Sequence, residues 1–230
     1  MTDGEKGQFR EPQYGVLKEL KEKIGLTSLG LMTNQVWHDD PRRLLFLLSR
    51  YKFVSKMLSG AYKVLEVGCG DAFGSRVVLQ EVNALTVVDF DPIFITDINE
   101  RMDEKWPLKC FEHDILAGPV VGGFNAAYCL DLIEHIPKEH ENTLMKNMVS
   151  SIEADGTLII GTPSSQSQVY ASPQSKQGHV NCFTHEQLKN LASRFFHNVF
   201  IFSMNDEVVH TGFSPMAHYL FALCSGKIND

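Results

Sequence analysis

The segment V-L-E-V-G-C-G-D-A-F-G at residues 64–74 constrains the fold more than any other part of the chain. A short apolar run is followed by three glycines, Gly68, Gly70 and Gly74, which predicts a buried strand and then a turn. Glycine allows backbone conformations that other residues avoid and lets a ligand approach the main chain closely. In an open parallel sheet such a turn lies at the carboxyl edge, where ligands bind. The segment therefore predicts an α/β fold with a binding site at this turn.

The remaining sequence alternates between strand and helix patterns. We expect strands at residues 64–67, 85–88, 108–111, 125–130, 157–161, 199–204 and 219–224. We expect helices at residues 41–58, 75–82, 92–102, 137–153 and 184–196. This alternation predicts a doubly wound, Rossmann-like sheet of seven mostly parallel strands, with the last strand antiparallel.

The chain is expected to fold as a single domain with an added N-terminal segment. Residues 1–60 are expected to form a helical cap, and residues 61–230 the main domain. The segment 163–181 is long and rich in Ser and Gln, so it is a candidate lid over the binding site. A helix at residues 184–196 is supported by Thr184 and Gln187, which have the spacing of a capping box.

Composition excludes several classes of partner. The net charge of −7 argues against a broad phosphate-binding surface, so no nucleic-acid partner is expected. The polar N-terminus and the five-residue length of the most apolar run, 44–48, argue against a membrane protein. The five cysteines include no C-x-x-C pair, which favours reduced thiols and a cytoplasmic protein. The sequence indicates no oligomeric state.

Two kinds of nucleotide ligand are compatible with the glycine turn. A dinucleotide fingerprint has the spacing G-x-G-x-x-G, but here the second gap, between Gly70 and Gly74, is one residue longer. The Glu66 carboxylate would oppose the pyrophosphate of NAD, whereas it suits a ligand that carries an ammonium and a sulfonium. Asp89, at the end of the second strand, can hydrogen-bond a ribose under either interpretation. Asp114, after the third strand, can accept a hydrogen bond from the exocyclic amine of adenine. We therefore predict a pocket for a nucleoside with a cationic tail.

The chain resembles the class I S-adenosylmethionine-dependent methyltransferases, in particular those with small-molecule acceptors. The similar motifs occur in order: V-L-E-V-G-C-G-D-A-F-G, V-V-D-F-D-P, F-E-H-D-I-L, L-D-L-I-E-H-I-P and D-G-T-L-I-I-G-T-P. G-H-V-N-C-F-T-H-E-Q-L at 178–188 also resembles small-molecule members of the group. The resemblance implies S-adenosyl-L-methionine as the cofactor and methyl transfer as the activity.

The resemblance also implies a role for individual positions. The implied cofactor-binding residues are Glu66, Gly68, Cys69, Gly70, Asp71, Gly74, Asp89, Phe90, Asp114, Ile115, Leu130 and Asp131. Among these, Asp89 would hold the ribose hydroxyls, Phe90 would lie against the adenine, and Asp114 would meet the adenine amine. The glycine-turn residues would surround the methionine part of the cofactor, and Leu130 and Asp131 would lie near its sulfonium. Tyr14, Trp37 and Arg50 are expected to contact the site from the cap.

Histidines are the candidate catalytic groups. His135 and His179 lie in the parts expected to form the acceptor site, and either could accept the acceptor's proton near neutral pH. Histidines at such positions are more often packing or capping residues, and many methyl transfers need only alignment of the reactants. No metal site is predicted, because both H-E-x-x-H-like segments lack the second histidine. The alternative is a cation held by Asp131, Glu134 and His135.

The sequence thus predicts a methyltransferase acting on an oxygen or nitrogen of a small molecule. N-D-E-V-V-H-T-G-F at 205–213 is polar enough to hold a hydroxylated acceptor, such as a sugar or sugar nucleotide. Two alternative functions remain compatible with the sequence. One is an NAD-dependent oxidoreductase, and the other is a non-catalytic protein that keeps the fold.

Overall fold

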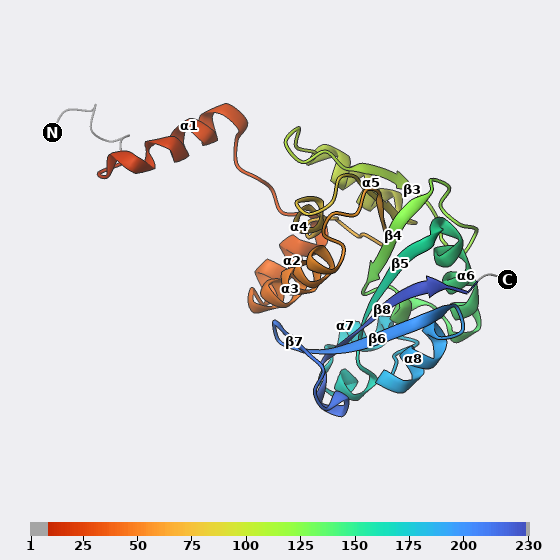
Figure 1. Ribbon diagram of the computed structural model, residues 1–230. Coiled ribbons are helices and arrows are strands. Elements are labelled where there is room, and N and C mark those ends of the chain that lie inside the picture. Colours follow the sequence, from red (N-terminus) through yellow and green to blue (C-terminus); the bar gives the residue numbers. More distant parts are fainter. Residues whose placement is uncertain (1–8, 229–230) are drawn as a thin grey trace, which may run out of the picture.

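The computed structural model describes residues 9–228 and shows one mixed sheet with helices on both faces (Figure 1). Its order is β3-β2-β1-β4-β5-β8-β6-β7. The strands are β1 (Val64–Val67), β2 (Leu85–Asp89), β3 (Lys109–Glu112), β4 (Phe124–Leu130), β5 (Ile152–Pro163), β6 (Phe196–Asn205), β7 (Val208–His210) and β8 (Tyr219–Lys227). Strands β1 to β5 pair in parallel, and β8 runs antiparallel between β5 and β6. The doubly wound sheet with an antiparallel last strand is confirmed.

The described residues form eight strands where seven were expected. The additional strand is β7, a three-residue edge strand that pairs antiparallel with the end of β6. Asp206 turns the chain between them with a positive φ of 51°, a conformation that aspartate tolerates better than most residues. A strand this short has no periodic pattern of its own, so its pairing with β6 is what defines it.

The helices cover the two faces of the sheet. They are α1 (Gly15–Ile24), α2 (Leu31–Asp39), α3 (Arg42–Met57), α4 (Ser75–Leu79), α5 (Pro92–Glu100), α6 (Glu141–Ser151), α7 (Pro173–Gly178) and α8 (His185–Ala192). One core cluster joins α6 and α8 to one face, and the other joins α3, α4 and α5 to the opposite face. Successive strand residues alternate between them, since Leu65 belongs to the first cluster and Val64 to the second.

Local capping explains where two helices begin. The Asp91 side chain accepts a hydrogen bond from the backbone N–H of Ile93 and starts α5, with Pro92 at the first helical position. Thr184 and Gln187 form the predicted capping box at the start of α8. The helix expected from residue 137 begins later, at Glu141, because a 3₁₀ turn at Lys138–His140 precedes α6. The residues at which these helices begin determine where the loops at the carboxyl edge of the sheet end.

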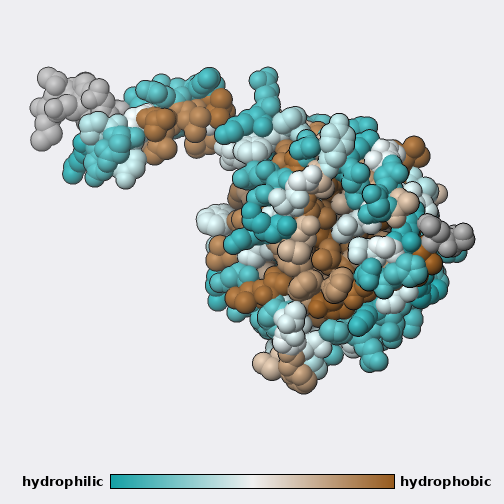
Figure 2. Space-filling model, viewed as in Figure 1, coloured by the Kyte–Doolittle hydropathy of each residue, from teal (hydrophilic) through white to brown (hydrophobic). Residues whose placement is uncertain are grey.

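The N-terminal segment divides into two parts. Helices α2 and α3 pack on the body beside α4, whereas α1 extends away from it as an arm (Figure 1). None of the α1 residues is buried, and Figure 2 shows an apolar stretch on this arm, where Val16, Leu17 and Leu20 are exposed. Residues 1–8 of the expected cap lie outside the described residues, and α1 buries none of its own residues. Among the described residues, no helix has both the length and the apolar character needed to cross a bilayer.

Candidate functional site

The glycine turn lies directly after β1, as the sequence predicts. Gly68 and Gly70 adopt positive φ angles of 72° and 51°, which a residue with a side chain rarely adopts. The backbone N–H of Gly68 donates to the carbonyl of Val88, so the turn is tied to the end of β2. The turn therefore lies at the carboxyl edge of the sheet, where ligands bind in folds of this kind.

Glu66 lies on β1, two residues before Gly68. Its carboxylate is buried, with 1% of the residue exposed, and it accepts hydrogen bonds from three hydroxyls. The donors are Tyr51 at 2.9 Å, Ser75 at 2.5 Å and Tyr128 at 2.7 Å. Burial raises the pKa of Glu66 to about 7, although the three hydroxyl donors act in the opposite direction. The structure thus places Glu66 as a buried connection among β1, β4, α3 and α4.

Asp89 occupies the position expected of a ribose-binding carboxylate. It ends β2 and is buried, and one oxygen accepts a hydrogen bond from the backbone N–H of Gly70 at 2.9 Å. The other oxygen accepts from the N–H of Asp91 at 3.0 Å. Each carboxylate oxygen can accept a second hydrogen bond, so both keep capacity for a ligand's hydroxyls. Asp89 therefore joins the glycine turn to the end of β2 and remains able to bind a diol.

The residues expected around the adenine follow the next two strand ends. Phe90 follows Asp89 and is 68% exposed, so its ring is available to a flat ligand. Asp114 lies on the surface after β3, and one of its oxygens accepts from the N–H of Leu116. Ile115 is buried, and its carbonyl accepts from the side chain of Asn147. Because β1, β2 and β3 are parallel neighbours, these positions lie along one edge of the sheet.

Two residues of the glycine turn face the protein. Cys69 is buried, and burial raises the pKa of its thiol far above the usual range. The carboxylate of Asp71 accepts hydrogen bonds from the backbone N–H and the hydroxyl of Thr33 at 2.7 and 3.2 Å. A Cβ on Gly70 would lie 2.7 Å from the sulfur of Met32. The start of α2 therefore covers the turn.

The cap residues named from the sequence lie in different places. Arg50 donates to both oxygens of Asp131, at 2.8 and 2.6 Å, and stacks on the ring of Tyr219 with its guanidinium carbon 4.0 Å from the ring centre. Asp131 follows β4, so this pair lies at the carboxyl edge. Tyr14 packs against Phe9 on the arm, and Trp37 is exposed on α2. The structure therefore brings only Arg50 to the sheet edge.

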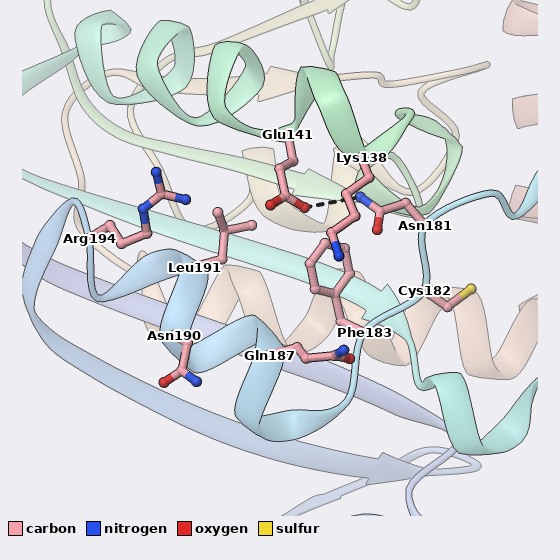
Figure 3. A pocket seen from close by; sticks show the side chains of 9 residues that line it. All are labelled: Lys138, Glu141, Asn181, Cys182, Phe183, Gln187, Asn190, Leu191 and Arg194. Carbon is pink, nitrogen blue, oxygen red and sulfur yellow. Dashed lines mark hydrogen bonds between the residues drawn. The ribbon is translucent and has the colours of Figure 1, made fainter.

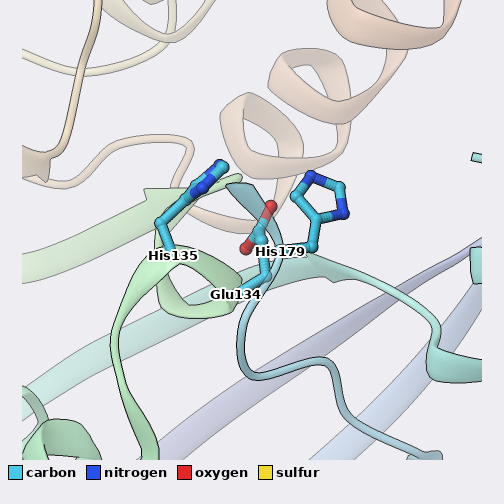
Figure 4. Close-up of side chains that lie close together, drawn as sticks. All are labelled: Glu134, His135 and His179. Atoms are coloured by element: carbon cyan, nitrogen blue, oxygen red, sulfur yellow. The ribbon is translucent and has the colours of Figure 1, made fainter. Parts of the chain in front are cut away.

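His135 and His179 come together beside a buried carboxylate. Their ring centres are 5.1 Å apart, and Figure 4 shows Glu134 between the two imidazoles. Burial, followed by the nearby charge of Asp131, raises the pKa of Glu134. Burial, followed by the proximity of His135, lowers the pKa of His179. The sequence predicted both histidines as candidates but not that a residue of the segment 163–181 and a residue after β4 would meet.

Two surface hollows lie near this edge. One has a volume of about 470 Å³ and is lined by Arg50, Pro163, Ser167, Gln168, Tyr170, Ala171, His179 and His218. The other, of about 260 Å³, lies between the start of α6 and α8 and contains Lys138, Glu141 and Arg194 (Figure 3). None of the expected cofactor-binding residues lines either hollow. We refer to the first as the acceptor cleft, because it contains His179 and the Arg50 that pairs with Asp131.

The structure adds residues that the sequence reasoning missed. Tyr51, Ser75 and Tyr128 hold Glu66, and Thr33 holds Asp71. The available signal was a tyrosine within the mostly apolar strand β4, since a buried hydroxyl needs a partner. The remaining partners could not be found, because they come from helices whose packing on the sheet no local sequence pattern encodes.

Gly74 provides a test of this arrangement. A Cβ at Gly74 would overlap the buried ring of Tyr51, which cannot move without breaking its hydrogen bond to Glu66. We expect Gly74→Ala to destabilise the fold by about 2 kcal/mol and lower Tm by about 4–8 °C. Thermal unfolding measures this, with Gly118→Ala as the control because a Cβ at Gly118 meets no atom within 4 Å. Equal Tm values for the two variants would contradict the packing.

Comparison with known proteins agrees with these observations. Residues 64–156 match the family model described as "Methyltransferase domain". The ubiquinone biosynthesis O-methyltransferase of Xanthomonas axonopodis pv. citri (strain 306) is 25% identical over 146 residues, which are 60% of this chain. The matched region spans 59% of that relative's length.

Solved structures share the fold. The N-methyltransferase NodS from Bradyrhizobium japonicum WM9, in complex with S-adenosyl-l-homocysteine, has a TM-score of 0.61 at 19% identity, covering 91% of this chain and 97% of that chain. The methyltransferase domain of bacterial CtHen1-C has a TM-score of 0.63 at 15% identity, covering 78% and 98%. Together with the ordered strand-end motifs, the family model confirms the resemblance of this chain to class I S-adenosylmethionine-dependent methyltransferases.

Proposed function

We propose that this protein transfers a methyl group from S-adenosylmethionine to an oxygen atom of a small molecule. The observation that carries the proposal is the pairing of the β1 glycine turn with Asp89, whose carboxylate receives the Gly70 N–H at 2.9 Å. The residues present fit the cofactor, since the turn has an open backbone conformation, Asp89 has free acceptor capacity and Phe90 is exposed. The preference for oxygen rests on the curated relative, whose name is an O-methyltransferase.

The chain's own residues would bind and orient the reactants. Asp89 would accept hydrogen bonds from the ribose hydroxyls, and the Phe90 ring would cover one face of the adenine. When bound, S-adenosylmethionine would supply an electrophilic methyl carbon to the acceptor oxygen, with the electron pair of the broken bond staying on sulfur and the hydroxyl proton of the acceptor passing to water. The Arg50–Asp131 pair would shape the end of β4 beside this carbon. Alignment of this kind accounts for a large share of the barrier lowering in bimolecular transfers.

The acceptor would enter through the acceptor cleft. The cleft offers polar groups from Ser167, Gln168 and His218, together with the apolar surface of Tyr170. This mixture suits a molecule that has both a ring and hydroxyl groups. The more specific prediction of a sugar or sugar nucleotide rested on residues 205–213, where Asn205 and His210 bond to each other at 2.8 Å. We retain it as the first acceptor class to screen.

Thermal unfolding with separately added ligands tests the cofactor. S-adenosylmethionine and S-adenosylhomocysteine at about 100 times their dissociation constants are expected to stabilise the fold by about 2.7 kcal/mol. For a chain of this size Tm should rise by about 5–10 °C. NAD at the same concentration serves as the control and is expected to leave Tm unchanged. A rise with NAD alone, or with none of the three, would contradict the proposed function.

A further inference from the structure

We propose that Glu134, His135 and His179 bind a divalent transition-metal cation beside the acceptor cleft. One ligand atom of each residue lies within 4.8 Å of the other two, and the three side chains come from the segment after β4 and from the end of the lid. Figure 4 shows the carboxylate between the two rings. Two imidazoles and one carboxylate form a ligand set typical of Zn²⁺, Fe²⁺, Co²⁺ and Mn²⁺ sites.

The carboxylate provides an independent indication of a ligand. Glu134 is fully buried, and its Oε2 accepts a hydrogen bond from the Thr162 hydroxyl at 3.1 Å. Its Oε1 is buried without any hydrogen-bond partner among the described residues. A buried carboxylate oxygen without a partner costs free energy, which a cation would offset. In metal sites a ligating carboxylate is commonly oriented by a hydrogen bond from a second residue. Glu134 fits this pattern, because Thr162 bonds to Oε2 and leaves Oε1 for the cation.

Both histidines are oriented through their Nδ1 atoms. The Nδ1 of His135 lies 3.0 Å from the carbonyl oxygen of Gly178, and the Nδ1 of His179 lies 2.8 Å from the side-chain oxygen of Gln168. Because both partners are acceptors, each Nδ1 carries the hydrogen and each Nε2 keeps its lone pair. This is the arrangement that holds imidazole ligands in metal sites. The bond lengths of such sites are about 2.1 Å, so the exposed ring of His135 must turn slightly inward.

Asp131 is not part of the set. Both of its oxygens are bound by Arg50, so the alternative trio of Asp131, Glu134 and His135 considered from the sequence is replaced by one that includes His179. His179 also lines the acceptor cleft. A cation there would face the acceptor, which is a role that rests on the proposed function. An acceptor hydroxyl bound to the cation would release its proton to water more readily and leave an oxygen lone pair for the methyl carbon.

Cation binding is tested on the full chain without any acceptor. After dialysis against a chelator, the chain is titrated with Co²⁺, Zn²⁺ and Mg²⁺ by calorimetry, and with Co²⁺ by visible absorption. We expect Co²⁺ and Zn²⁺ to bind at about one per chain, and Mg²⁺ to bind at least tenfold more weakly. His135→Ala and His179→Ala should each weaken Co²⁺ binding at least tenfold and change the visible spectrum.

The control variant is His140→Ala, which removes an exposed histidine from the same stretch of chain and should bind Co²⁺ like the unaltered protein. Each variant is also tested for the rise in Tm with S-adenosylhomocysteine, which reports folding and the cofactor site separately. Absence of Co²⁺ and Zn²⁺ binding in the unaltered chain, or equal binding in all variants, would overturn the metal site. Loss of the S-adenosylhomocysteine response alone would instead overturn the proposed function.

Discussion

Replacing Asp89 with alanine is expected to weaken S-adenosylmethionine binding about 100-fold. The variant loses the only buried carboxylate at the end of β2, which receives the Gly70 N–H and is proposed to receive the ribose hydroxyls. A hydrogen bond to a charged acceptor contributes about 1.5–3 kcal/mol, and a 100-fold loss of affinity corresponds to about 2.7 kcal/mol, so the loss of one such bond is enough to account for this factor. Calorimetric titration with S-adenosylhomocysteine measures the change directly.

The control for this prediction is Asp91→Ala. Asp91 lies two residues further on and caps α5 through the N–H of Ile93, so its removal should lower stability by about 1 kcal/mol. Asp91→Ala should change ligand affinity by about threefold at most, because the Asp91 side chain bonds to the start of α5 rather than to the glycine turn. Similar affinities for the Asp89→Ala variant and the unaltered protein would show that the ligand binds elsewhere. Asp89→Asn, which keeps one acceptor oxygen, should fall between the two.

Glu66 should make the stability of the fold depend strongly on pH. The pKa of Glu66 is about 7 in the folded chain, above its ordinary value of 4.5, because burial disfavours the charged form. Below about pH 4.5 both states carry the proton, and the folded state has no penalty. As pH rises from 4.5 through 7, the unfolded chain releases the proton while the folded chain retains it. The free energy of unfolding therefore falls over this window, by about 3 kcal/mol in total.

Glu66→Gln removes this titration and keeps a side chain of similar size. The difference in unfolding free energy between the unaltered protein and the variant should change by about 3 kcal/mol between pH 4.5 and pH 8, when measured by denaturant titration. The matched control is Glu139→Gln, an exposed position on the turn before α6, which should leave the pH profile unchanged. Parallel profiles for the Glu66→Gln variant and the unaltered protein would contradict this assignment.

The sheet and the cofactor edge could be predicted from the sequence. Strand periodicity and the glycine turn are local signals, so β1, β2 and β4 appeared where apolar runs placed them, and Asp91 and Thr184 started the helices that they were expected to start. Asp89 was predictable for the same reason, because the last residue of a parallel strand lies at the ligand edge regardless of the packing around it. The short strand β7 was missed, since it is defined by its partner β6.

The sequence by itself determined the fold class, the resemblance to methyltransferases and the sheet edge at which the site is proposed, because these depend on patterns within short stretches of chain. Only the tertiary structure decided the contacts between distant stretches. It placed Glu66 among the hydroxyls of Tyr51, Ser75 and Tyr128, and it brought His179 from the lid to Glu134 after β4. Such contacts depend on how helices and loops pack on the sheet, and no local periodicity encodes that packing.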